Sequence, residues 1–166
     1  MLGPKSEIAI GKYGSQIPKV FLPYISKIKD VKPDGHYGFR SVAVGLAQKQ
    51  GKYMSIWRQL LLEMRRNEGI WRQVFDPENV GQYDELYNRI YFGGVGREGP
   101  KNYMLIVHTL HIRGSNTIFP LLGGPDDAEE PHQVVVVVFV DSGHFIYVTL
   151  EGSYPMPPTN LIWNSK

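Results

Sequence analysis

The feature that most constrains the fold is an uninterrupted apolar run near the C-terminus, QVVVVVFV, in which five consecutive valines precede Phe139 and Val140. β-Branched side chains favour extended backbone, and a strand without alternating polar positions is typical of one that is covered on both faces. An exposed run of this kind would promote aggregation. We therefore expect a central β-strand with other parts of the chain packed over it.

Three other segments of the second half share this apolar, β-branched character: MLIVHTLHI, NTIFPLL and HFIYVTL. They are separated by R-G-S, by the acidic stretch GGPDDAEEP and by D-S-G, whose residues are typical of turns and loops. The short D-S-G connection between the valine run and HFIYVTL predicts a β-hairpin. Together these segments predict a mostly antiparallel sheet.

The first half of the chain has helical periodicity instead. Apolar residues recur at helical spacing in FRSVAVGLAQKQ and YMSIWRQLLLEMRRNE, and the segments IWRQVF and QYDELYNRIYF predict two further short helices. Leu22, Ile25 and Ile28 in FLPYISKIKDV have roughly the same spacing and predict a short helix ahead of these. Residues 1–20 contain Gly, Pro and Lys with little periodicity, so we expect them to form a loose N-terminal arm.

A chain of 166 residues, of which 42% are hydrophobic, is large enough for one globular domain with its own core. The order of the segments predicts an α/β (α+β) fold, in which N-terminal helices pack on a mostly antiparallel central β-sheet and residues 21–166 form a single domain. No apolar run is long enough to span a bilayer, and the first residues lack the apolar core of a signal peptide. We therefore expect a cytoplasmic or nuclear protein that is not secreted.

The absence of cysteine excludes disulfides, a thiolate nucleophile and a cysteine-based zinc site. His108 and His111 lie three residues apart in an expected strand, so their side chains would face opposite sides of the sheet. We expect neither a metal site nor a cofactor. The net charge of +2 is too small to indicate a nucleic-acid partner, and Arg58, Arg65 and Arg66 are expected to form a solvated helix face.

One stretch has the pattern of a catalytic loop: D-G-H-Y-G-F-R, from Asp34 to Arg40, in which a turn runs directly into a helix. The first turn of a helix presents unpaired backbone N–H groups and the positive end of the helix dipole. These groups lower the pKa of a nucleophile placed there and can receive the oxyanion of a tetrahedral intermediate. A histidine on a neighbouring strand then serves as general base, held by a third polar side chain.

The extended motif D-G-H-Y-G-F-R-S-V-A resembles D-G-[NH]-C-x-F-R-A, the nucleophile motif of the ovarian-tumour (OTU) cysteine proteases, most of which are deubiquitinases. It is most similar to the plant branch associated with Mutator-like transposases, where D-G-H-C-G-F-R-A-V-A is ordinary. The segment H-F-I-Y-V-T-L-E-G-S-Y-P-M-P-P also resembles that branch's ending, H-F-V-x-V-x-L-x-x-G-C-P-x-P-P. These matches lie in the family's order and cover most of residues 20–163. The resemblance implies an OTU-like fold and a transposon-derived plant protein.

By this resemblance, Tyr37 stands at the position of the catalytic cysteine and His144 at that of the catalytic histidine. The backbone amides of Asp34, Gly35, His36 and Tyr37 correspond to the oxyanion hole. His144 also has a plainer interpretation, as a polar residue at the start of a strand that is hydrogen-bonded to Asp141 or to Tyr37.

The third member of the catalytic triad varies within the family, and Asp34 and Asn160 both remain open as candidates. The chain departs from the family pattern once more, because K-N-Y-M runs almost directly into the strand LIVHTLHI. Relatives carry a further helical stretch at this point. The shortened 101–106 region is therefore expected to alter one wall of the ubiquitin-binding groove.

A tyrosine is a poor replacement for the cysteine. An unperturbed phenol has a pKa of about 10, so only about one molecule in a thousand is ionised at neutral pH. The ring is also far bulkier than a thiol and is expected to fill the space of the scissile bond. A cysteine-type protease is excluded because the chain has no cysteine.

We therefore expect a catalytically inactive pseudoprotease that acts as a protein-binding or regulatory module. Its partner is either ubiquitin, through the inherited groove, or a different protein, and no nucleic acid or membrane is expected. The alternative is a ubiquitin-directed hydrolase with residual or novel activity from a Tyr37/His144 dyad, and a third interpretation is a folded remnant without a function. The dyad requires the Tyr37 oxygen within hydrogen-bond reach of a His144 nitrogen, beside an open cleft. The sequence leaves the oligomeric state open.

Overall fold

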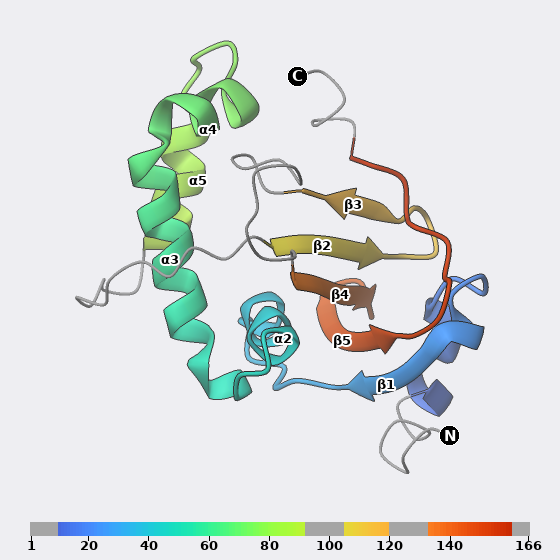
Figure 1. Ribbon diagram of the computed structural model, residues 1–166. Helices are drawn as coiled ribbons and strands as arrows, with labels where there is room; N and C mark the ends of the chain where they lie inside the picture. Colours follow the sequence, from blue (N-terminus) through green and yellow to red (C-terminus); the bar gives the residue numbers. More distant parts are fainter. Residues whose placement is uncertain (1–9, 92–104, 120–132, 161–166) are drawn as a thin grey trace.

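The computed structural model describes residues 10–91, 105–119 and 133–160 (Figure 1). Its strands form one five-stranded sheet in the order β1-β5-β4-β2-β3. Neighbouring strands run antiparallel except β2 and β4, which are parallel. The strands are β1 (Ile25–Lys29), β2 (Leu105–Leu110), β3 (Asn116–Ile118), β4 (Gln133–Val140) and β5 (His144–Leu150). The expected mixture of helices and a mostly antiparallel sheet is confirmed.

The valine run forms β4, which lies between β5 and β2 in the middle of the sheet. Val135 to Val138 are each at most 4% exposed, so both faces of this strand are covered, as expected. The connection to β5 is the expected hairpin turn. Its residues Asp141 and Ser142 have positive φ angles of 50° and 54°, the backbone conformation found in tight hairpin turns.

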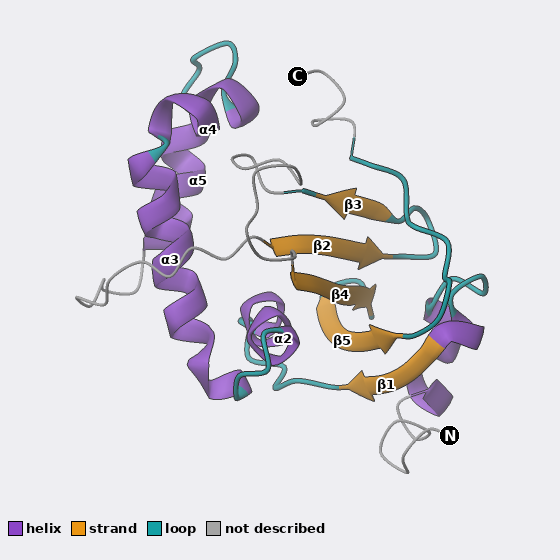
Figure 2. Ribbon diagram, in the orientation of Figure 1, coloured by secondary structure: helices purple, strands orange, loops and turns teal. Residues whose placement is uncertain are grey.

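The helices form a second and a third layer beside the sheet (Figure 2). They are α2 (Tyr37–Gly45), α3 (Tyr53–Arg66), α4 (Glu68–Phe75) and α5 (Gln82–Tyr91), with short 3-10 turns at Gly14–Gln16, Leu22–Tyr24 and Gln50–Lys52. Helix α2 packs against β5 and β4, α3 packs against α2, and α4 and α5 pack against α3. The expected packing of the helices on the sheet thus applies mainly to α2.

Helix α2 approaches the sheet closely through Gly45. A Cβ atom built on Gly45 would lie 2.6 Å from Cγ1 of Val135 and 3.1 Å from Cε2 of Tyr147. The helix therefore needs a residue without a side chain at this position. This contact holds α2, which begins at the end of the D-G-H-Y loop, close to β4 and β5.

The expectation of a loose N-terminal arm is wrong for residues 10–20. Residues 10–13 are helical, and Tyr13 and Ile17 are each only 1% exposed. They join the core cluster that contains Val136, Val138 and Ile146. Side chains alternate between the faces of a strand, so this cluster lies on the face opposite the one that Val135 turns toward α2. The physical reason is that a strand buried on both faces needs two covers, and the helices supply one. Residues 1–9 lie outside the described part.

The short helix expected around Leu22, Ile25 and Ile28 is also wrong. Only Leu22–Tyr24 forms a 3-10 turn, and Ile25–Lys29 is a strand that pairs with β5. The pairing register shifts between Ile25 and Lys27, which indicates a β-bulge. Because of this extra residue, Ile25 and Ile28 both face the core, at 6% and 4% exposed. Because of the bulge, the two buried isoleucines are three residues apart, and this spacing resembles that of a helix.

Candidate functional site

The structure brings together the two residues that the sequence singled out, Tyr37 and His144. Tyr37 is the first residue of α2 and His144 is the first residue of β5, two elements that pack on each other. Their ring centroids are 5.2 Å apart and the ring planes are inclined by 76°, an edge-to-face contact. Gly143 lies directly beside them, since a Cβ built on it would be 4.0 Å from the Tyr37 hydroxyl.

An aspartate that the sequence did not single out holds His144 in place. Nε2 of His144 lies 2.7 Å from Oδ1 of Asp30, the residue that follows β1, and His144 is only 9% exposed. Oδ2 of Asp30 accepts a hydrogen bond of 2.8 Å from the Tyr13 hydroxyl. Nζ of Lys12 donates to that hydroxyl and lies 3.8 Å from Oδ2. Asp30 is thus the acidic partner of the histidine.

The charge state of Asp30 follows from its surroundings. Burial acts to raise the pKa of Asp30, but the hydrogen bonds from His144 and Tyr13 outweigh it, so the pKa lies below its ordinary value of 3.8. An ionised carboxylate favours a proton on Nε2 of His144, which leaves Nδ1 as the acceptor in the neutral ring. Nδ1 is buried and has no hydrogen-bond partner within the described residues. This is the nitrogen that would take a proton from a nucleophile.

Tyr37 does not supply that proton. Nε2 of His144 is bonded to Asp30 and Nδ1 has no partner in the described part, so the hydrogen bond required by a Tyr37/His144 dyad is absent. The interpretation of His144 as a partner of Asp141 or Tyr37 is wrong for the same reason. Asp141 instead accepts a bond of 2.8 Å from the side-chain amide of Gln16. The arrangement is a histidine–aspartate pair with the Tyr37 ring packed edge-on against the histidine.

Asp34, expected as a possible third triad member, has a different partner. Nη2 of Arg40 lies 2.5 Å from Oδ2 of Asp34, and Nε of Arg40 lies 3.1 Å from each carboxylate oxygen. These bonds, helped by the backbone N–H of His36, lower the pKa of Asp34 to about 2. Arg40 is itself 7% exposed, and its Nη1 donates to the carbonyl of Gln50 at 3.0 Å. Asp34 therefore fixes the shape of the loop.

The loop expected to form an oxyanion hole has part of its donors engaged. The N–H of His36 donates to the Asp34 carboxylate at 3.2 Å, and the N–H of Asp34 donates to the carbonyl of Lys32 at 3.0 Å. Gly35 has a φ of 83°, a conformation that favours glycine. The amides of Gly35 and Tyr37 donate to no other described residue. Half of the proposed oxyanion donors thus remain available.

Aromatic packing ties this loop to α3. The His36 ring stacks on Tyr53 with centroids 4.9 Å apart, and Phe39 stacks on Trp57 at 5.3 Å with nearly parallel planes. The Arg40 guanidinium lies 4.0 Å from the centroid of the Tyr53 ring. The motif residues that flank Tyr37 are therefore held from the helical side, while Tyr37 itself faces β5.

Two other expected positions lie elsewhere. The backbone N–H of Asn160 donates to the carbonyl of Thr117, in β3, which is the edge of the sheet opposite β1. Asn160 is therefore not the partner of His144. In the shortened 101–106 region, residues 101–104 lie outside the described part, and the remaining two residues begin β2.

His108 lies in β2 and His111 directly follows that strand, and the two side chains have different neighbours. Nδ1 of His108 lies 3.0 Å from the Thr117 hydroxyl, and burial lowers the pKa of His108. His111 instead contacts the ring of Phe139. Within residues 10–91, 105–119 and 133–160, no cluster of three His, Asp or Glu side chains could hold a metal ion. No helix of the described part has the length and apolar character needed to cross a bilayer.

Comparison with models of known protein families, with curated proteins and with solved structures finds no match to this chain. The geometry around Tyr37 and His144 is therefore the basis on which a function can be proposed.

Proposed function

We propose that this chain is an OTU-like domain that has lost hydrolytic activity and acts as a protein-binding module. The observation that carries the proposal is the pairing of His144 with Asp30 beside a tyrosine at the nucleophile position. A histidine held by a carboxylate is the base half of a nucleophilic hydrolase site. The motif resembles a cysteine-protease loop, and descent from such a protease would explain a histidine–aspartate pair that has no nucleophile beside it.

Loss of hydrolysis follows from what Tyr37 does. Its ring packs edge-on against His144, and no hydrogen bond connects the two side chains. His144 is therefore not placed to remove the proton of the Tyr37 hydroxyl, and an unperturbed phenol stays mostly protonated at neutral pH. The Tyr37 ring also occupies the position from which a thiol would attack.

A binding role is supported by the parts of the site that remain ordered. The buried Arg40 still fixes Asp34, and the Gly35 and Tyr37 amides still offer donors at the start of α2. Such donors suit the backbone of an extended peptide segment, such as the tail of another protein. We favour a partner other than ubiquitin, because the Tyr37 ring narrows the channel that a ubiquitin tail would need.

A second candidate function is hydrolysis by a Tyr37/His144 dyad. The buried, unpartnered Nδ1 of His144 favours it, because rotation of the Tyr37 side chain could bring the hydroxyl to that atom. The cost of leaving a buried nitrogen unsatisfied, about 1–3 kcal/mol, would favour such a rotation.

Two assays test these functions. The wild-type chain and the variant Tyr37→Phe are first incubated with ubiquitin that carries a fluorogenic amide at its C-terminus. We expect no release of fluorophore from either protein. Turnover by the wild type that disappears in Tyr37→Phe would contradict the proposal and establish the dyad.

Binding is then followed by NMR, with the unlabelled chain titrated into isotope-labelled ubiquitin. Localised shifts on the ubiquitin tail and its hydrophobic patch would identify a ubiquitin reader. A flat titration at millimolar concentration, which we expect, directs the search to another partner by affinity capture. If Tyr37→Arg abolishes capture of that partner while Val20→Arg, a change at an exposed position elsewhere, does not, the interaction uses this site.

A further inference from the structure

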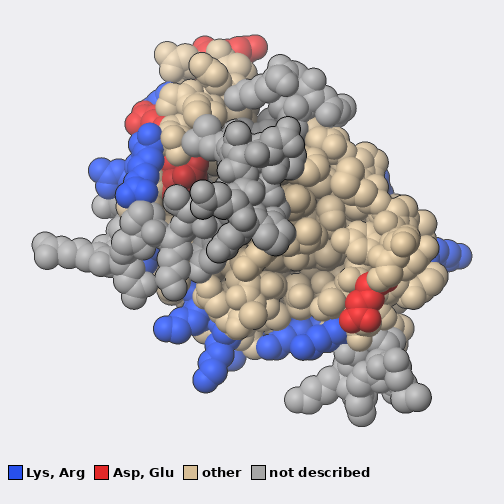
Figure 3. Space-filling model, viewed as in Figure 1, with Lys and Arg blue, Asp and Glu red and all other residues tan. Residues whose placement is uncertain are grey.

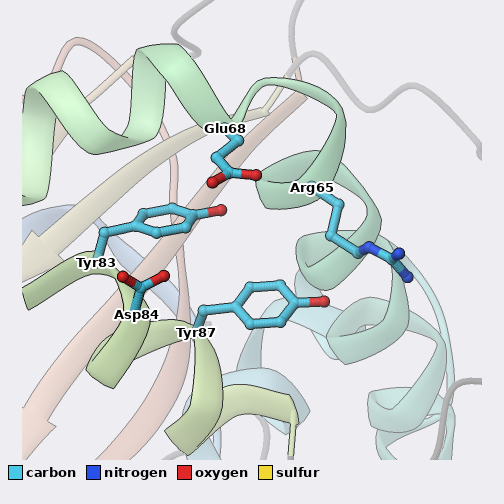
Figure 4. A pocket seen from close by; sticks show the side chains of 5 residues that line it. All are labelled: Arg65, Glu68, Tyr83, Asp84 and Tyr87. Atoms are coloured by element: carbon cyan, nitrogen blue, oxygen red, sulfur yellow. The ribbon is translucent and has the colours of Figure 1, made fainter. Parts of the chain in front are cut away.

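The helical layer contains a pocket that is separate from the Tyr37 and His144 site. It has a volume of about 360 Å³, and its lining residues come from α3, α4 and α5: Arg65, Glu68, Tyr83, Asp84 and Tyr87 (Figure 4). None of these residues contributes to the candidate site described above. The volume is at the lower end for ligand pockets and suits a single side chain.

Two tyrosine rings form the apolar part of the pocket. Tyr83 is 3% exposed, and its hydroxyl donates a hydrogen bond of 2.8 Å to the carbonyl of Met64. The Tyr87 ring lies nearly parallel to it, with centroids 6.2 Å apart and planes inclined by 22°. Tyr83 is therefore rigidly placed, and Tyr87 adds a second ring whose π-electron density attracts a cation.

Two carboxylates share a single guanidinium beside these rings. Nε of Arg72 lies 2.8 Å from Oε1 of Glu68, while its Nη2 and Nη1 lie 2.6 and 3.2 Å from the two Asp84 oxygens. The trio carries a formal charge of −1. The side chains of Glu68 and Asp84 are 51% and 57% exposed, so a ligand can reach their remaining lone pairs.

Arg72 shows which ligand chemistry this surface accepts. Its guanidinium carbon lies 4.5 Å from the centroid of the Tyr83 ring while its nitrogens bind Asp84 in a fork. Tyr87 follows Tyr83 by four residues on the same helix and lines the pocket together with Glu68. The pocket thus combines a second aromatic ring with a second carboxylate.

We propose that this pocket binds an arginine side chain of a partner protein. The guanidinium stacks on Tyr87 and bonds to Glu68, as that of Arg72 does with Tyr83 and Asp84. Arg65 lies at the rim, and Figure 4 shows its guanidinium turned away from both rings. Figure 3 shows both charge signs interspersed over the helical layer, so recognition rests on this local combination and not on a broad acidic surface.

The test is an NMR titration of the isotope-labelled chain with N-acetylarginine methylamide. The control ligand is the corresponding citrulline derivative, which has nearly the same shape but no charge. We expect saturable shifts of α4 and α5 amides with arginine at millimolar concentration. Citrulline should bind at least about threefold more weakly, because it forms neither a cation–π contact nor an ion pair. Equal binding of the two ligands, or shifts outside the pocket, would overturn the proposal.

Variants locate the site. We expect Tyr87→Leu and Glu68→Gln each to weaken arginine binding at least about threefold, and Arg65→Gln to strengthen it by removing a like charge. The matched control is Glu78→Gln, because Glu78 is an exposed carboxylate that does not line the pocket. Equal losses of arginine affinity in Glu68→Gln and Glu78→Gln would show that only the overall charge matters and would refute the proposal.

Thermal melts by circular dichroism verify that each variant is folded. The outcome is independent of the Tyr37 assays, which involve different residues.

Discussion

At the scale of single residues, two aspartates that follow β1 have different tasks. Asp30 bonds to His144 and Tyr13 and keeps the histidine in one orientation. Asp34 bonds to Arg40 and keeps the loop before α2 in one conformation. Neither bond involves Tyr37, so the loss of a nucleophile that we propose leaves both tasks intact.

The Asp34–Arg40 pair predicts a specific pH dependence of stability. The pKa of Asp34 is lowered from 3.8 to about 2, chiefly by the Arg40 bonds. A depressed pKa in the folded state adds stability that is present above pH 3.8 and is lost as pH falls through 2. In urea unfolding followed by tryptophan fluorescence, we expect Asp34→Asn to be less stable than wild type at pH 7. The difference between the two free energies of unfolding should shrink between pH 4 and pH 2. A difference that stays constant over this range would contradict the assignment.

Part of the site could be predicted from single residues, and part could not. The motif resemblance located Tyr37 and His144, and the structure brings their rings to 5.2 Å. Asp30 was missed because its position depends on the pairing of β1 with β5, whereas the segment before it has the spacing of a helix. The sequence did contain one signal for a strand that ends beside Asp30. The apolar Ile28 lies between the charged residues Lys27 and Lys29, an alternation typical of a strand.

At the scale of elements, the contact between α2 and the sheet predicts opposite effects of the same substitution at two helical glycines. Gly45→Ala places a Cβ 2.6 Å from Val135, and we expect it to destabilise the protein by about 1–3 kcal/mol through overpacking. Gly69→Ala in α4 meets nothing within 4 Å, so helix propensity should make it neutral or stabilising by up to about 1 kcal/mol. Chemical denaturation of both variants measures the two effects. If the Gly45 variant were as stable as the Gly69 variant, the close packing of α2 on β4 would be refuted.

Most elements could be predicted from local pattern, and the exception has a local cause. The stripes of α2 and α3 are long enough for their helical periodicity to be unambiguous, and the valine run indicates a strand because it is β-branched almost throughout. β1 has only five residues and contains a bulge, so its two buried isoleucines, Ile25 and Ile28, lie three apart. A pattern of this length does not separate a bulged strand from one helical turn.

At the scale of the whole molecule, the segment of residues 10–21 forms part of the core. Ile17 is 1% exposed and belongs to the cluster on the sheet face opposite α2, so we expect Ile17→Ala to lower the free energy of unfolding by about 2–4 kcal/mol. Val20, at 54% exposed, is a control in the same segment, and Val20→Ala should change stability by less than about 0.5 kcal/mol. Equal and small effects in thermal unfolding would show that the segment is the loose arm first expected from its composition.

The architecture as a whole was predictable in outline. Helices in the first half and strands in the second implied a mixed fold with a central valine strand, and the strand order places β4 there. The second cover of that strand was not predictable from composition, because a segment with Gly, Pro and Lys gives no periodic signal. The burial of residues 10–21 can be inferred only from β4, whose two apolar faces each need a segment of the chain to cover them.

We propose that Tyr37 occupies the nucleophile position of a site whose base is intact. The most direct measurement is the thiol pKa of Tyr37→Cys, obtained from the pH dependence of alkylation by iodoacetamide. The chain has no other cysteine, so the signal reports this position alone. We predict a pKa below about 7.5, because the thiol proton can pass to Nδ1 of His144 and the helix terminus stabilises the thiolate. The value should rise in the double variant Tyr37→Cys/His144→Gln. A thiol pKa of about 8.5 or higher that does not respond to His144 would contradict the account.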